Sequence, residues 1–111
     1  GTMYVLDIGT SKVIKDNLPN TPQTRTGAGA VTLTEPLTYI VSTGANALTM
    51  ADGYNGQEKY LVMKTDAGDA TLTPTNLYNG STLTFNDVGD SAHLIFMDGQ
   101  WVYMGGTATL A

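Results

Sequence analysis

The chain has 111 residues, the length of one domain, and its five basic and ten acidic residues give a net charge of −5. This acidic balance argues against a nucleic-acid partner, which needs a basic surface, and no run of about 18 apolar residues predicts insertion into a membrane. The lack of cysteine excludes disulfides, thiolate metal sites and cysteine nucleophiles. Because 41% of the residues are hydrophobic, the low content of charged residues does not indicate disorder.

Threonine and glycine are abundant, with 18 and 13 residues, and these residue types are typical of strands and turns. No segment repeats its apolar residues with helical spacing over three turns. We therefore predict an all-β protein. Gly1 and Thr2 precede Met3 and are interpreted as a cloning remnant, so that Met3–Ala111 is the expected natural product; a piece cut from a longer chain is the alternative.

The N-terminal segment, residues 3–29, differs from the rest of the chain in composition and periodicity. Met3–Ile8 is a short apolar run that predicts one strand, whereas residues 17–29 combine two prolines with threonine and glycine and show no periodicity. We interpret residues 3–29 as an arm that adds a strand to the sheet edge of a neighbour, either a sister subunit or another protein. Pairing of this strand within its own subunit is the alternative. The residues expected to make the attachment are Tyr4, Val5, Leu6 and Ile8.

Residues 30–111 are predicted to form one β domain. Short apolar or threonine-rich runs alternate with turn residues such as Asp52-Gly53, as in proteins built of many short strands. The expected architecture is a compact sandwich or prism of about eight short antiparallel strands. The predicted strands are Val31–Thr34, Leu37–Val41, Ala47–Met50, Glu58–Lys64, Ala70–Thr73, Thr82–Phe85, Ala92–Met97 and Gln100–Met104.

The last two strands carry the strongest local signal. Asp98-Gly99 is typical of a two-residue type I′ turn, and pairing across it sets Phe96 opposite Trp101 and Ile95 opposite Val102. Both faces of this hairpin are then apolar, whereas a hairpin with one face in water is polar on that side. The hairpin is therefore either central in a sandwich or in contact with another subunit. We predict that copies of the chain associate through an interface formed by Leu94, Ile95, Phe96, Trp101, Val102 and Tyr103.

Four motifs between residues 30 and 106 resemble a small β module in structural proteins of tailed bacteriophages, especially marine cyanophages. These motifs are the turn with Ala51, Asp52, Gly53, Gly56 and Gln57; the segments Thr71–Asn76 and Leu83–Ser91; and the terminal set Leu94, Phe96, Asp98, Gly99, Trp101, Gly105 and Gly106. The resemblance implies a homotrimer with a structural role in the virion, as a capsid decoration protein, head fibre or tail-fibre segment. Residues 3–26 lie outside it.

Few residues suggest catalysis, metal binding or ligand binding. His93 is the one histidine; it lies in an apolar strand without a Gly-x-Ser-x-Gly motif and is interpreted as a core or interface residue. Residues 66–69 and 86–90 offer closely spaced oxygen ligands for calcium, but they lack EF-hand spacing and are also ordinary turn formers. Trp101 is interpreted as a core or interface residue rather than as a platform for sugars. We predict no enzyme activity and no cofactor.

The sequence thus predicts a non-enzymatic virion protein of the capsid decoration or head-fibre type, whose partners are copies of itself and the major capsid protein or another virion protein. One alternative is a receptor-binding tail-fibre tip that contacts a host glycan or an outer-membrane protein. Another is a carbohydrate-binding accessory module of a cellular protein. Binding to preformed capsids, to host cells or to an isolated polysaccharide distinguishes the three.

Overall fold

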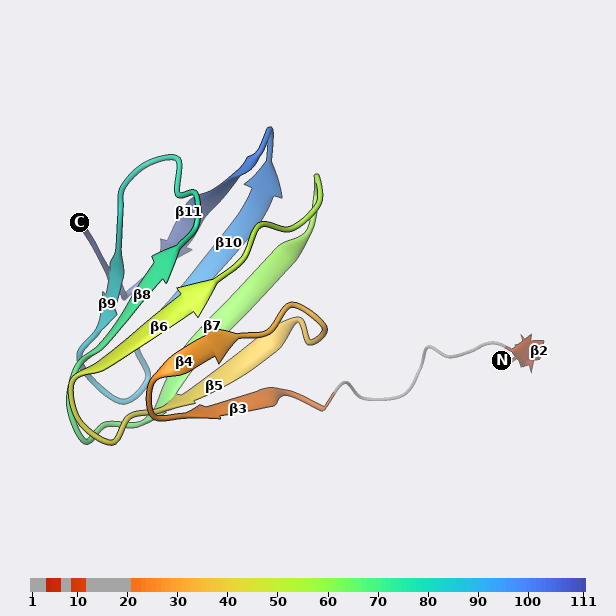
Figure 1. Ribbon diagram of the computed structural model, residues 1–111. Helices are drawn as coiled ribbons and strands as arrows, with labels where there is room; N and C mark the ends of the chain where they lie inside the picture. The colour runs from red at the N-terminus through yellow and green to blue at the C-terminus, as the bar shows by residue number, and fades with distance from the viewer. Residues whose placement is uncertain (1–3, 7–8, 12–20) are drawn as a thin grey trace.

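A computed structural model describes residues 4–6, 9–11 and 21–111. Every regular element within these residues is a strand, which confirms the predicted all-β class. Two five-stranded sheets pack face to face, and a separate two-stranded sheet consists of β1 (Tyr4–Leu6) and β2 (Gly9–Ser11) (Figure 1). The described residues include no helix that is long and apolar enough to cross a membrane.

The two large sheets are called sheet 1 and sheet 2 here. Sheet 1 has the order β11-β10-β7-β5-β3 and sheet 2 has the order β12-β9-β8-β6-β4. Seven of the eight predicted strands are observed to within two residues at either end, and the strand predicted at Val31–Thr34 is observed at Gly29–Val31. The strands of sheet 1 are β3 (Gln23–Thr26), β5 (Leu37–Val41), β7 (Glu58–Thr65), β10 (Ser91–Met97) and β11 (Gln100–Gly106). The strands of sheet 2 are β4 (Gly29–Val31), β6 (Asn46–Met50), β8 (Ala70–Pro74), β9 (Leu83–Phe85) and β12 (Thr109–Leu110).

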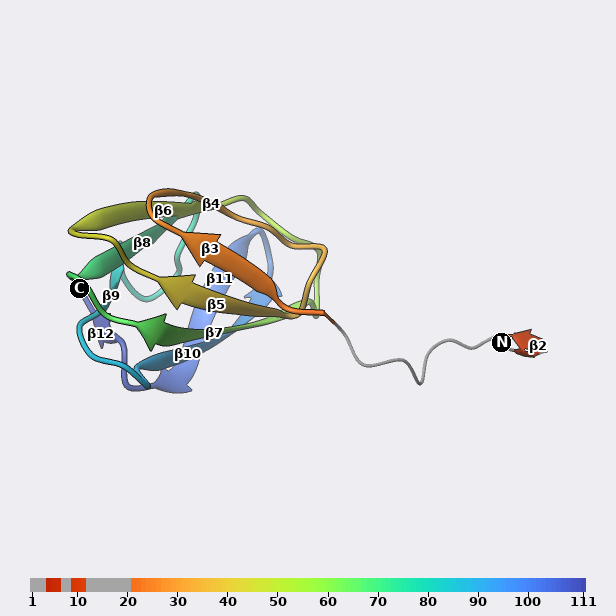
Figure 2. The same cartoon turned by 90° about the horizontal axis from the view of Figure 1, so that it is seen from below.

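The expectation that the strands are antiparallel is wrong for the N-terminal half of the sandwich. From β3 to β8 the chain alternates between the two sheets, so that β3, β5 and β7 run parallel in sheet 1 and β4, β6 and β8 run parallel in sheet 2 (Figure 2). Parallel neighbours need a crossover connection, and here the intervening strand of the other sheet supplies it. The remaining pairs, which involve β9 to β12, are antiparallel.

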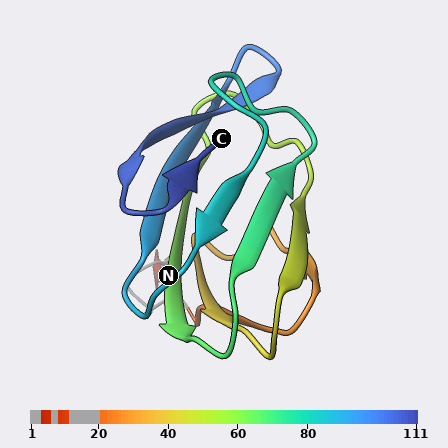
Figure 3. The same ribbon diagram turned by 90° about the vertical axis from the view of Figure 1, so that its left-hand side faces the viewer.

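The predicted C-terminal hairpin is confirmed. Strands β10 and β11 pair with Phe96 opposite Trp101, in the register expected from the sequence. Asp98 and Gly99 have φ angles of 53° and 80°, as a type I′ turn requires, and glycine adopts such angles without steric cost. The hairpin tip lies at the same end of the sandwich as the loops that follow β6 and β8 (Figure 3).

The hydrophobic core fills the space between the two sheets. Trp101 is its largest member and is fully buried, with Nε1 donating to the Ala51 carbonyl at 2.8 Å and the indole ring edge-on to Phe96 at 5.2 Å. This placement confirms Trp101 as a core residue. The buried apolar side chains are Val31, Ile40, Leu48, Met50, Leu61, Met63, Ala70, Leu72, Leu83, Phe85, Ala92, Leu94, Phe96, Trp101 and Ala108.

The sandwich begins before residue 30, because β3 lies inside the segment that we interpreted as an arm and linker. The side chain of Gln23 joins this strand to its neighbours: Oε1 accepts from Thr38 Oγ1 at 2.9 Å, and Nε2 donates to the Ala30 carbonyl at 3.2 Å. Of the residues expected to attach the protein to a neighbour, Tyr4, Val5 and Leu6 form β1, which pairs with β2 in the same chain. Ile8 lies outside the described residues.

Candidate functional site

The outer face of sheet 1 is apolar. Along each strand every second side chain points to this face, where contact with water would favour polar residues. The apolar side chains that it exposes, in part or largely, are Leu37, Tyr39, Val41, Tyr60, Val62, Ile95, Met97, Val102 and Met104. The outer face of sheet 2 is different, because it carries mainly threonine: Ala30, Ala47, Thr49, Thr71, Thr73, Thr84 and Thr109. Of the two large sheets, sheet 1 therefore offers the apolar outer surface.

A row of residues that pair across four strands of this face ends at a glycine, which leaves a space without a side chain. Leu37, Tyr60, His93 and Gly105 lie opposite one another on β5, β7, β10 and β11. The rings of Tyr60 and His93 stack with their centroids 4.4 Å apart and their planes 2° from parallel. A β-bulge makes Met104 the extra residue of β11, so a glycine rather than a side chain stands next to His93. The bulge thus leaves space at the end of the row.

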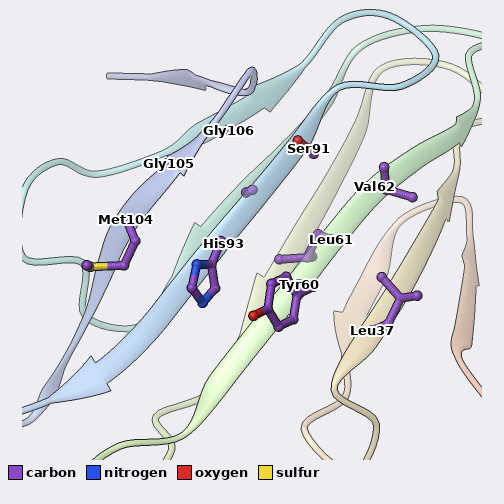
Figure 4. A pocket seen from close by; sticks show the side chains of 10 residues that line it. Leu37, Tyr60, Leu61, Val62, Ser91, His93, Met104, Gly105 and Gly106 are labelled. Carbon is purple, nitrogen blue, oxygen red and sulfur yellow. The ribbon is translucent and has the colours of Figure 1, made fainter. Parts of the chain in front are cut away.

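That space is a groove of about 420 Å³ with a mainly apolar lining (Figure 4). Gly106 forms part of its edge with a φ angle of +136°, and a Cβ at this position would overlap the carbonyl oxygen of Ser91. The backbone itself therefore shapes this end of the groove. The lining consists of Leu37, Tyr60, Leu61, Val62, Ser91, Ala92, His93, Met104, Gly105 and Gly106.

A polar cluster lies beside the groove. The Oε1 atom of Glu58 accepts hydrogen bonds from His93 Nε2 at 2.9 Å and from the Tyr60 hydroxyl at 3.0 Å. The bond from His93, followed by that from Tyr60, lowers the pKa of Glu58, and the bond to Glu58 raises the pKa of Tyr60. The carboxylate thus orients both rings. Within the described residues no hydrogen bond joins His93 to the Ser91 hydroxyl.

The structure divides the predicted interface residues between two environments. Ile95 and Val102 lie on the outer face of sheet 1, as a subunit interface requires. Leu94, Phe96 and Trp101 are buried in the core of the single chain, so they form no surface for a partner. The sixth residue, Tyr103, faces inward and its hydroxyl donates to the Ala108 carbonyl at 2.9 Å. Both faces of the hairpin are apolar, and the sequence did not indicate which face sheet 2 covers. His93 lies partly exposed on the outer face, outside the core.

The acidic turns considered for calcium use their carboxylates locally. Asp90 Oδ2 accepts from the backbone amides of Asn86 at 2.9 Å and Asp87 at 3.1 Å, and Asp66 Oδ1 accepts from the Gly68 amide at 3.1 Å. The Asn86 bond is the main cause that lowers the pKa of Asp90. These are turn-forming contacts. In the part of the chain that the structure describes, no three acidic or histidine side chains converge as a metal site would need.

Comparison with known proteins adds no functional assignment. No protein-family model matches the sequence, and no curated protein shows significant similarity to it. The function is therefore inferred from the surfaces of the sandwich and from the motifs of its sequence.

Proposed function

We propose that the protein is a non-enzymatic structural protein that associates with copies of itself through the outer face of sheet 1. The observation that carries this proposal is the apolar character of that face beside the threonine-rich outer face of sheet 2. Contiguous exposed apolar surface is typical of protein interfaces, and charged residues are depleted at interface centres. Glu58 and Lys64 are the acidic and basic residues on this face, and Glu58 is bound to His93 and Tyr60.

A structural role also agrees with the size of the chain. A domain of 111 residues buries about two-thirds of the surface that its unfolded chain exposes, and association buries more. The groove beside His93 would receive a side chain of the neighbouring copy, because its lining is mainly apolar. The number of copies, three, and the place in a virion as a capsid decoration or head-fibre protein rest on the sequence resemblance to bacteriophage structural proteins.

Replacing Val102 with glutamate is expected to dissociate the oligomer. Val102 lies on the outer face of sheet 1, so a charge there is solvated in the single chain but would be unpaired and desolvated in an interface. Light scattering at low micromolar concentration should give about 35 kDa for the wild type, which is three chains of 11.7 kDa, and 11.7 kDa for the variant. Thr73→Glu, on the outer face of sheet 2, is the control and should remain trimeric. A monomeric wild-type protein, or a trimeric Val102→Glu variant, contradicts the proposal.

We further propose that the residues before the sandwich attach it to the capsid. A truncated protein without these residues tests this proposal. It must begin before β3, because a protein that starts at Ala28 would lack β3 and its pairing with β5. A protein that starts at Thr21 keeps both large sheets. It should remain folded and trimeric, as measured by circular dichroism and light scattering, but should no longer sediment with capsids. Undiminished capsid binding would place the attachment surface within residues 21–111.

A further inference from the structure

A second hollow lies at the loop end of the sandwich, where Glu58 separates it from the apolar groove. It has a volume of about 340 Å³ and lies between the loop that follows β4 and the loop that precedes β7. Its surface is mainly polar. The lining consists of Leu33, Thr34, Pro36, Tyr54, Gly56, Gln57 and Glu58. Binding sites for small ligands have volumes of about 300–1,000 Å³, so this hollow has the size for one or two sugar rings.

The walls of this hollow are held in place by buried or partly buried polar side chains. Gln57 bridges the two loops: its Oε1 accepts from the Tyr54 amide at 3.2 Å, and its Nε2 donates to the Leu33 carbonyl at 3.3 Å. Beneath them, Lys59 is 1% exposed and its Nζ donates to the carbonyls of Thr32 at 2.8 Å and Glu35 at 2.6 Å. A site whose loops are already fixed loses less conformational entropy when it binds a ligand.

The groups that line the hollow suit a polyhydroxylated ligand. Tyr54 is 69% exposed, so most of its ring is available as an apolar platform. The Glu58 carboxylate is a hydrogen-bond acceptor, and within the described residues only its Oε1 atom makes hydrogen bonds. Thr34 carries a hydroxyl that donates to Glu35 Oε1 at 2.8 Å and can still accept. The carboxylates of Glu35 and Glu58 disfavour an anion, and the net charge of −5 adds to this effect.

We propose that this hollow binds a neutral saccharide, with Tyr54 stacking on the sugar ring and Glu58 and Thr34 accepting hydrogen bonds from its hydroxyl groups. Thr34 and Tyr54 lie in loops at the end of the sandwich, whereas Glu58 is the first residue of β7 and lies on the outer face of sheet 1, so the site adjoins the face proposed for self-association. A structural protein with this site would contact a glycan-bearing surface through the loop end of the sandwich.

The test is a titration of the ¹⁵N-labelled full chain with methyl glycosides of glucose, galactose, mannose and N-acetylglucosamine, followed by NMR. We expect at least one of them to shift the amide signals of Tyr54, Gly56 and Gln57 in a saturable manner. Tyr54→Ala should weaken that binding about tenfold, since an aromatic contact contributes about 1.4 kcal/mol. Galacturonate should bind less tightly than galactose because of its charge.

The chain provides a matched control for the loss of an exposed tyrosine. Tyr78 is 68% exposed and stands in the same Tyr-Asn-Gly sequence as Tyr54, but it does not line the hollow. Tyr78→Ala should therefore bind the sugar as the wild type does. The proposal is overturned if none of the four glycosides gives saturable shifts, if Tyr54→Ala binds unchanged, or if Tyr78→Ala loses binding equally. Light scattering of the same variants tests self-association independently, and both should keep the wild-type mass.

Discussion

Replacing Trp101 with alanine is expected to lower the free energy of unfolding by about 3–5 kcal/mol, the usual cost of truncating a buried aromatic side chain. The indole is fully buried between the two sheets, packs edge-on against Phe96 and donates its Nε1 hydrogen to the Ala51 carbonyl. The truncation would leave a cavity in the close-packed core, since the paired strands β10 and β11 hold the surrounding backbone in place. Denaturation by urea, followed by circular dichroism, measures the loss.

The Trp101→Phe variant separates packing from hydrogen bonding. Phenylalanine keeps an aromatic ring in the core but leaves the Ala51 carbonyl without its indole donor, so the expected loss is smaller, about 1–2 kcal/mol. The backbone of Trp101 remains bonded to Asn76 and Tyr78 in both variants, and the loop after β8 should stay in place. If Trp101→Ala were as stable as the wild type and instead lost binding to a ligand, Trp101 would be a recognition residue.

The strands could be predicted from the sequence where an apolar or threonine-rich run of at least four residues lies between turn residues. Leu37–Val41 is observed with the predicted ends, and the Asp98-Gly99 turn determined the register of the last hairpin. Strands β3 and β12 were not predicted, because Gln23–Thr26 has no apolar residue and Thr109–Leu110 is too short to show a period. Their pairing depends on neighbours that are distant in the chain.

The direction of the strands could not be predicted from alternation. Inward-facing residues such as Leu48 and Leu72 follow the same period of two whether their strands run parallel or antiparallel. The parallel arrangement results from the path of the chain between sheets, and no turn signal marks it. The groove also has no signal in the sequence. It depends on a bulge that brings Gly105 next to His93, and a single extra residue in a strand leaves no recognisable pattern.

The burial of Lys59 could have been predicted from the alternation of residues in β7. In β7, Leu61 and Met63 face the core, and Lys59 has the same parity, so strict alternation places this lysine inside. Long charged side chains in strands usually reach solvent, which is why a lysine in such a position is readily taken as exposed. Here the ammonium group instead donates to the carbonyls of Thr32 and Glu35 in the loop that precedes β5.

The buried lysine predicts an unusual dependence of stability on pH. Burial lowers the pKa of Lys59 to about 8 in the folded protein, against 10.5 in an unfolded chain. Between these values the unfolded chain binds more protons than the folded protein, so stability rises with pH. The free energy of unfolding should increase by about 2 kcal/mol between pH 7 and pH 9.5. Tyr60 and Tyr103 act in the opposite direction at higher pH, because their pKa values are raised in the folded protein.

Lys59→Met identifies the source of this rise. Methionine retains an unbranched apolar chain in the core but does not titrate, so the increase between pH 7 and pH 9.5 should disappear in the variant. Lys64→Met, in the same strand but exposed on the outer face of sheet 1, should keep the increase of the wild type. Urea denaturation of the three proteins at pH 7, 8, 9 and 9.5 provides the comparison. If the free energy of unfolding rose equally with pH in the wild type and in Lys59→Met, the ammonium group of Lys59 would keep its ordinary pKa. Its hydrogen bonds to the loop carbonyls would then offset the cost of its burial.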